Sequence, residues 1–162
     1  MRLLPIALLA LLTGHATASR FQVDVEVPRL NVAEYHAPYV AFWVESQDRS
    51  TIVPLGLWYD EQENWLKDIR QWWRRTGRGQ RKPYDGLTGA TRPPGQHQME
   101  FGELETLQAL PAGSYRLVVE AAREVGGREV VQLPFQWPAS DLQRQHANGT
   151  NELGTVTLTV HP

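Results

Sequence analysis

The sequence predicts a mainly β fold, because its apolar residues fall in short runs that end at Gly, Pro or polar turns. Residues 21–27 (FQVDVEV) and 155–160 (TVTLTV) alternate apolar and polar side chains, the pattern of a strand with one buried face. Residues 39–44 (YVAFWV) are almost all apolar and favour β structure, which predicts a strand covered on both faces.

The remaining strands complete a two-layer arrangement. Residues 51–58 pair with 39–44 through a polar turn, and residues 116–122 pair with 129–137 through Val125-Gly126-Gly127. We expect a further short strand at 98–101 and a polar loop at 139–151. Short strands joined by Gly/Pro turns, with one intervening α-helix, predict an immunoglobulin-like β-sandwich.

The helix is predicted over residues 61–75. Asp60 fits an N-cap, Glu63 completes a capping box, and Gly77 follows a cationic last turn as a stop signal. A stripe at helical spacing contains Trp65, Leu66, Ile69, Trp72 and Trp73. The stripe suits the covering of a sheet core, and it also offers aromatic rings for stacking.

The N-terminal residues predict a cleavable export signal. Arg2 precedes an apolar run at residues 3–12, and Ala16 and Ala18 provide the small side chains of a cleavage site. We expect cleavage after about Ala18, a periplasmic protein, and a single domain over residues 19–162 with no transmembrane segment.

Composition excludes several kinds of site. With no Cys among 162 residues, the chain has no disulfide, no thioether-linked haem and no Cys-ligated iron–sulfur cluster. A net charge of -2 gives no field that would attract nucleic acid. The His residues beyond the signal segment lack the paired spacing of a zinc site.

Breaker clusters on both sides make residues 78–96 a predicted surface loop without a regular element. Inside it stands Asp85-Gly-Leu-Thr-Gly-Ala-Thr91. The hydroxyl of Thr91 is a nucleophile suited to phosphoryl transfer, and the small Gly89 and Ala90 leave room around it. Asp85 and Thr88 can hold the turn or be read by a second protein.

This segment resembles the flavinylation motif D-x-x-[S/T]-G-A-[S/T], to which FAD:protein FMN transferases attach FMN. All five specified positions match. The resemblance implies that Thr91 is the FMN acceptor and that Asp85, Thr88, Gly89 and Ala90 form its recognition sequence. Arg92, with Lys82, Arg78 and Arg81, offers cations for the resulting phosphodiester. A Trp of the 61–75 helix, or His97, is a candidate for contact with the flavin.

The chain as a whole is similar to the predicted periplasmic proteins of domain-of-unknown-function family 2271. The similarity rests on Phe42-Trp-Val-Glu45, the Trp-rich helix, Arg92-Pro-x-Gly95, and the G-x-Y-x-L-x-x-E-x-x-R-E pattern of residues 113–124. It implies an association with PepSY-type membrane reductases and with FMN transferases, often in iron uptake.

Two functions follow as expectations. The first is an exported electron carrier with FMN on Thr91, which relays electrons from a membrane reductase to an extracytoplasmic acceptor such as a ferric complex. Such a carrier need not be an enzyme by itself. The alternative is a cofactor-free β-sandwich that serves as a binding or assembly module of a periplasmic uptake system.

Overall fold

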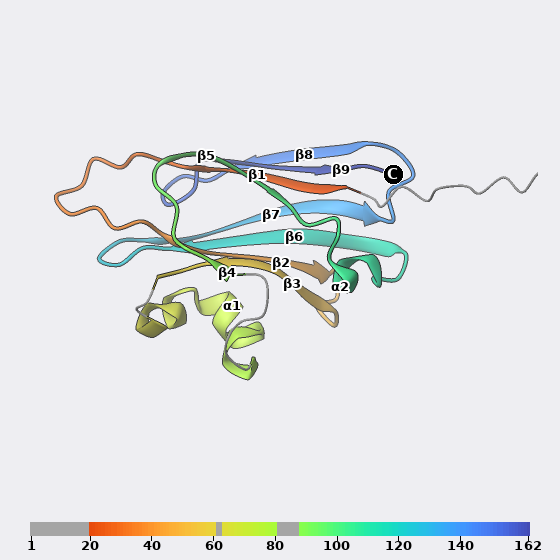
Figure 1. Ribbon diagram of the computed structural model, residues 1–162, viewed down its shortest axis with the longest axis horizontal. Coiled ribbons are helices and arrows are strands. Elements are labelled where there is room, and N and C mark those ends of the chain that lie inside the picture. The colour runs from red at the N-terminus through yellow and green to blue at the C-terminus, as the bar shows by residue number, and fades with distance from the viewer. Residues whose placement is uncertain (1–19, 61–62, 81–87) are drawn as a thin grey trace, which may run out of the picture.

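The computed structural model describes residues 20–60, 63–80 and 88–162, and the predicted signal segment, residues 1–18, lies outside them (Figure 1). The strands are β1 (Phe21–Val27), β2 (Tyr39–Ser46), β3 (Ile52–Trp58), β4 (Thr88–Gly89), β5 (Gly95–Glu100), β6 (Gly113–Ala122), β7 (Arg128–Trp137), β8 (Gln143–Asn148) and β9 (Thr155–Val160). The helical elements are the 3-10 helices η1 (Glu63–Asp68) and η2 (Gly77–Gly79) and the α-helices α1 (Arg70–Arg75) and α2 (Glu105–Gln108).

The strands form two sheets, which Figure 1 shows as two stacked layers. One sheet has the order β5-β1-β9-β8 and the other has the order β4-β3-β2-β6-β7. All strand pairs are antiparallel except the short parallel pair of β3 and β4. The mainly β prediction is therefore confirmed, and so are the two predicted hairpins, β2–β3 and β6–β7.

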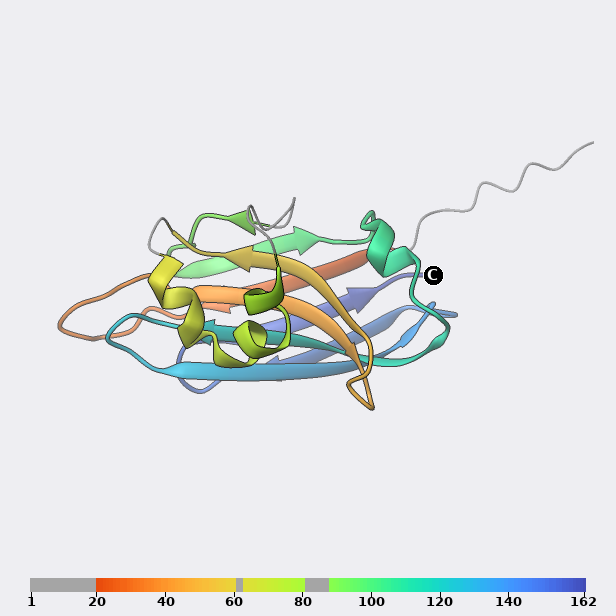
Figure 2. The ribbon, with the colours of Figure 1, turned by 90° about the horizontal axis from the view of Figure 1, so that it is seen from below.

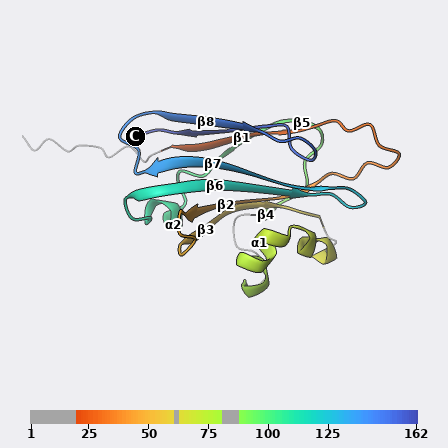
Figure 3. The ribbon, with the colours of Figure 1, turned by 180° about the vertical axis from the view of Figure 1, so that it is seen from behind.

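The apolar side chains divide into two cores because the strands of the five-stranded sheet bury both faces. The inner core lies between the sheets and includes Phe21, Phe42, Trp58 and Phe135. The outer core lies under the helical segment, on the other face of β2, β3 and β6 (Figures 2 and 3). Strand β2 contributes to both, as its apolar sequence predicts.

A bulge in β3 decides which of its side chains face the inner core. The register with β2 shifts between Phe42 and Trp43, so Leu55 is an extra residue on β3. After the bulge, Leu57 faces the outer core and Trp58 the inner one. Gly56 lies in the bulge, where a Cβ atom would come within 3.3 Å of the Phe101 ring.

The prediction of one continuous helix over residues 61–75 is wrong. A 3-10 helix, η1, ends at Asp68, and α1 begins after Ile69, which provides no side-chain cap. Asp60, the predicted N-cap, accepts a hydrogen bond from the Tyr39 hydroxyl. Gly77 is the first residue of η2, and a Cβ atom there would lie 2.4 Å from the Trp72 ring. It is therefore a site of close packing rather than a left-handed stop.

The start of α1 is held by a carboxylate from the sheet. Glu120 on β6 is fully buried and accepts hydrogen bonds from the backbone N–H groups of Gln71, at 3.0 Å, and Trp72, at 2.7 Å. Arg128 balances its charge through a bond of 2.5 Å from Nε to Oε1. This contact takes the place of a sequence-local cap and docks the helical segment on the outer core.

The predicted polar loop at 139–151 contains a strand, β8, and that part of the prediction is wrong. Its sequence, QRQHAN, has no apolar alternation because the strand lies at a sheet edge and most of its side chains are exposed. A four-residue helix, α2, was also not anticipated.

Two glutamates hold the turn between β8 and β9 to the β6–β7 hairpin. Glu152 pairs with Arg123 at 2.8 Å, and Gly126 and Gly127 leave room for this pair, since a Cβ atom at either would lie within 2.7 Å of it. Glu129 accepts the backbone N–H groups of Thr150, Asn151, Glu152 and Leu153. Burial raises the pKa of Glu129, but these N–H groups lower it more, so its pKa lies below the ordinary value.

Replacement of Glu120 by Ala should destabilise the fold by about 3–5 kcal/mol, because it leaves Arg128 and two helix N–H groups without an acceptor. Glu120→Gln should be less damaging, since an amide oxygen still accepts from an N–H group. Urea unfolding followed by Trp fluorescence measures both. Equal stability of Glu120→Ala and the wild type would contradict this account of α1.

Glu129→Gln should lower the free energy of unfolding by about 2 kcal/mol at neutral pH, because the carboxylate accepts several N–H bonds in the folded state. The folded pKa is depressed, so this stability is present above the ordinary value of 4.5 and is lost as pH falls through the folded pKa. Unfolding of both proteins across this range should show the difference shrinking in acid. A difference independent of pH would point to packing instead.

Candidate functional site

The described part of the motif, Thr88–Thr91, begins at one edge of the five-stranded sheet. Thr88 and Gly89 form β4 and pair in parallel with Leu57 and Trp58 of β3. The Tyr59 N–H group donates to the Gly89 carbonyl at 3.0 Å. Asp85 lies outside the described residues. The prediction of residues 78–96 as a loop without regular elements is wrong at η2, β4 and the start of β5.

After Gly89 the chain leaves this sheet and enters the other one. Strand β5 begins at Gly95, which pairs with Val27 of β1, so residues 90–94 cross from one layer to the other (Figure 1). Ala90 and Arg92 are exposed on this crossing segment, and Thr91 is half-buried. The candidate acceptor therefore sits on a short extended segment that is hydrogen-bonded into a sheet on each side.

Trp58 is the aromatic residue against which the crossing segment packs. The Arg92 guanidinium carbon lies 5.7 Å from the centre of its ring. The His97 ring meets the same indole edge-on at 5.6 Å and donates from Nε2 to the Pro93 carbonyl at 2.7 Å. Trp58 is only 5% exposed and also contacts Phe42 of the inner core. The segment is thus tied to the core through Trp58.

Sequence reasoning missed this role of Trp58. The residue ends an apolar strand far from the motif in sequence, and its direction depends on the β3 bulge. His97 is a candidate in the sequence only because it lies close to the motif along the chain. No periodic pattern could have joined Trp58 to Arg92, since their contact depends on the parallel pairing of β3 and β4.

The aromatic stripe of the helical segment serves mainly as core. Leu66, Ile69 and Trp72 are buried against the outer face of the five-stranded sheet, while Trp65 and Trp73 are partly buried beside them. This confirms that the stripe covers a sheet. Contact of one of these Trp residues with a flavin stays a prediction.

The other candidate cations are dispersed or undescribed. Arg78 is exposed in η2, and Arg81 and Lys82 lie outside the described residues. Among residues 20–60, 63–80 and 88–162, no group of three His, Asp or Glu side chains is arranged to hold a metal ion. Arg92 belongs to the crossing segment itself, one residue after Thr91, and its guanidinium lies over the Trp58 ring.

The fold and the site define a two-sheet β protein in which the segment that joins the sheets, residues 90–94, contains Thr91 and Arg92. The family model "Predicted periplasmic protein (DUF2271)" matches residues 20–155. The chain therefore belongs to this family, and the family description agrees with the export predicted from residues 1–18. Searches of curated proteins and of solved structures gave no significant match. No helix in the described part of the chain has the length and apolar character needed to cross a bilayer.

Gly89→Ala should fold as well as the wild type, within about 1 kcal/mol, because its Cβ atom would lie 3.8 Å from Trp58 and 4.0 Å from Arg92. Gly77→Ala is the matched control and should lose about 1–3 kcal/mol through its clash with Trp72. Thermal unfolding compares the two. A large loss in Gly89→Ala would show that Gly89 is required for packing, not only for access to the motif.

Proposed function

We propose that the protein is an exported flavoprotein electron carrier with FMN attached through a phosphoester to Thr91. The observation that carries this proposal is the complete D-x-x-T-G-A-T motif, of which Thr88–Thr91 lies at an accessible sheet edge. Attachment is a phosphoryl transfer in which the Thr91 oxygen bonds to the FMN phosphorus of FAD. The hydroxyl proton is released, and AMP leaves.

The described residues suit this modification. Ala90 and Arg92 are exposed, so a transferase can approach the segment that carries Thr91. Pairing of β4 with β3 and of β5 with β1 keeps the segment extended, which reduces the ordering needed for recognition. Arg92 directly follows the acceptor in sequence and is exposed, so its guanidinium is available to pair with the negative phosphodiester.

The bound flavin would supply the redox chemistry, since it can take up and release electrons. The protein's own part is to hold the cofactor at a fixed place on a rigid sandwich. We further propose a PepSY-type membrane reductase as the electron donor and an extracytoplasmic acceptor such as a ferric complex. We also assign the two sheets to an immunoglobulin-like sandwich, supported by two face-to-face sheets between which the chain passes from β1 to β2, from β4 to β5, from β5 to β6 and from β7 to β8.

Co-expression with an FMN transferase, followed by export and intact mass measurement, tests the attachment. The wild type should gain the mass of FMN less one water, and Thr91→Ser should gain it too, because either hydroxyl fits the motif. Thr91→Ala should gain nothing, while Thr106→Ala, a change at an exposed Thr of α2, should be labelled like the wild type.

An unmodified wild-type chain, in cells where a known acceptor is labelled, would refute the carrier. The alternative, a cofactor-free binding or assembly module, would then remain. Labelling of Thr91→Ala to the wild-type level would refute the assignment of the acceptor.

A further inference from the structure

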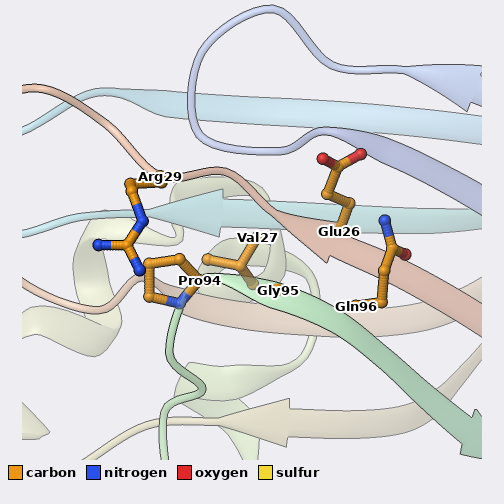
Figure 4. A pocket seen from close by; sticks show the side chains of 6 residues that line it. All are labelled: Glu26, Val27, Arg29, Pro94, Gly95 and Gln96. Carbon is orange, nitrogen blue, oxygen red and sulfur yellow. The ribbon is translucent and has the colours of Figure 1, made fainter.

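A pocket of about 290 Å³ lies directly beyond the crossing segment (Figure 4). It is formed where the end of β1 pairs with the start of β5, through Val27 and Gly95. The residues that line it are Glu26, Val27, Arg29, Pro94, Gly95 and Gln96. Its volume is near the lower end of the range for small-molecule sites.

The lining combines an apolar middle, in which Pro94 and Gly95 are accessible and Val27 is buried, with polar groups on two sides. Figure 4 shows Val27, Pro94 and Gly95 between the Arg29 side chain and the pair Glu26 and Gln96. The Glu26 carboxylate accepts the Thr155 N–H group at 3.1 Å, which fixes it toward β9. Arg29 is exposed, so its guanidinium is accessible to a ligand in the pocket. Such a surface suits a flat, partly polar ring better than a phosphate alone.

Gly95 keeps part of this surface open. Its φ of +142° lies in a region that other residues rarely adopt, and a Cβ atom there would meet nothing within 4 Å. The backbone at the start of β5 is therefore bare, and a planar ring can approach it closely.

The pocket is within reach of the acceptor. Pro94 and Gly95 follow Thr91 by three and four residues, and an extended chain covers at most about 14 Å over that interval. The phosphate and the ribityl chain of an attached FMN separate its ring from the Thr91 oxygen. The ring can therefore lie at a distance from this oxygen comparable to that between Thr91 and the pocket. The acceptor and the pocket also lie on one continuous stretch, residues 91–96.

We propose that the isoalloxazine ring of FMN on Thr91 docks in this pocket, with the Arg29 guanidinium beside it; this inference rests on the attachment proposed above. Arg29 then stabilises the reduced ring, which carries one negative charge after it takes up two electrons and one proton. Arg29 thereby makes the reduction potential of the flavin less negative than it would be without this charge, and the pocket shields one face of the ring from solvent.

The test compares flavinylated wild type with Arg29→Gln, Arg29→Lys and Arg144→Gln. Arg144 is exposed on β8, at the opposite edge of the same sheet, and serves as the matched control. Intact mass gives the occupancy of each protein. Spectroelectrochemical titration gives the midpoint potential, and iodide quenching of flavin fluorescence gives the exposure of the ring.

Arg29→Gln should be fully labelled but should show a more negative midpoint potential and stronger quenching than the wild type. Arg29→Lys, which keeps the charge, should retain most of the wild-type potential, and Arg144→Gln all of it. Full labelling with the same potential and quenching in Arg29→Gln would overturn the docking site and leave the attachment intact. Absence of labelling in the wild type would overturn both.

Discussion

The site depends on one constraint of the backbone, the passage of residues 90–94 from one sheet to the other. Strand β4 is bonded to β3 on one side, and β5 is bonded to β1 on the other, so the two ends of this segment are fixed in different layers. Trp58 contacts Arg92 in the middle of the segment and His97 in the strand that follows it. The proposed acceptor, Thr91, is half-buried between two exposed residues on this segment, so a second protein can approach it while its position relative to the core is set.

Buried carboxylates join elements of the two sheets and the helical segment elsewhere in the fold. Glu45, Glu120 and Glu152 are almost fully buried, and each is paired with at least one arginine. Glu45 binds Arg116 at 2.7 Å on the neighbouring strand, Glu120 holds α1, and Glu152 joins two turns. Loss of one partner would leave a buried charge, so these pairs specify the arrangement even where they add little net stability. Such an arrangement suits the proposed carrier, because electron transfer needs a cofactor whose surroundings change little.

The sequence predicted the elements whose burial is regular and missed those set by long-range contacts. Strands β1 and β9 have strict alternation because one face is buried, and β2 is apolar because both faces are. Strand β8 is polar except for Ala147 and has no such alternation. The predicted helix is interrupted at Ile69, and the start of α1 is capped by Glu120 of β6, a long-range contact. In the site, the motif was visible in the sequence, but Trp58 and the pocket beside Gly95 depend on strand pairing that local patterns do not encode.

The proposed function requires the hydroxyl of Thr91 to be the acceptor of FMN. Lys82 and Arg92 each precede proline, so trypsin should release residues 82–116 as one peptide, which also contains the hydroxyls of Thr88 and Thr106. Fragmentation of this peptide from flavinylated protein locates the added mass most directly. Fragments that contain Thr91 should carry the FMN mass, and fragments limited to residues 82–90 should not. Flavin mass on Thr88 or Thr106, or a peptide without it, would refute Thr91 as the acceptor.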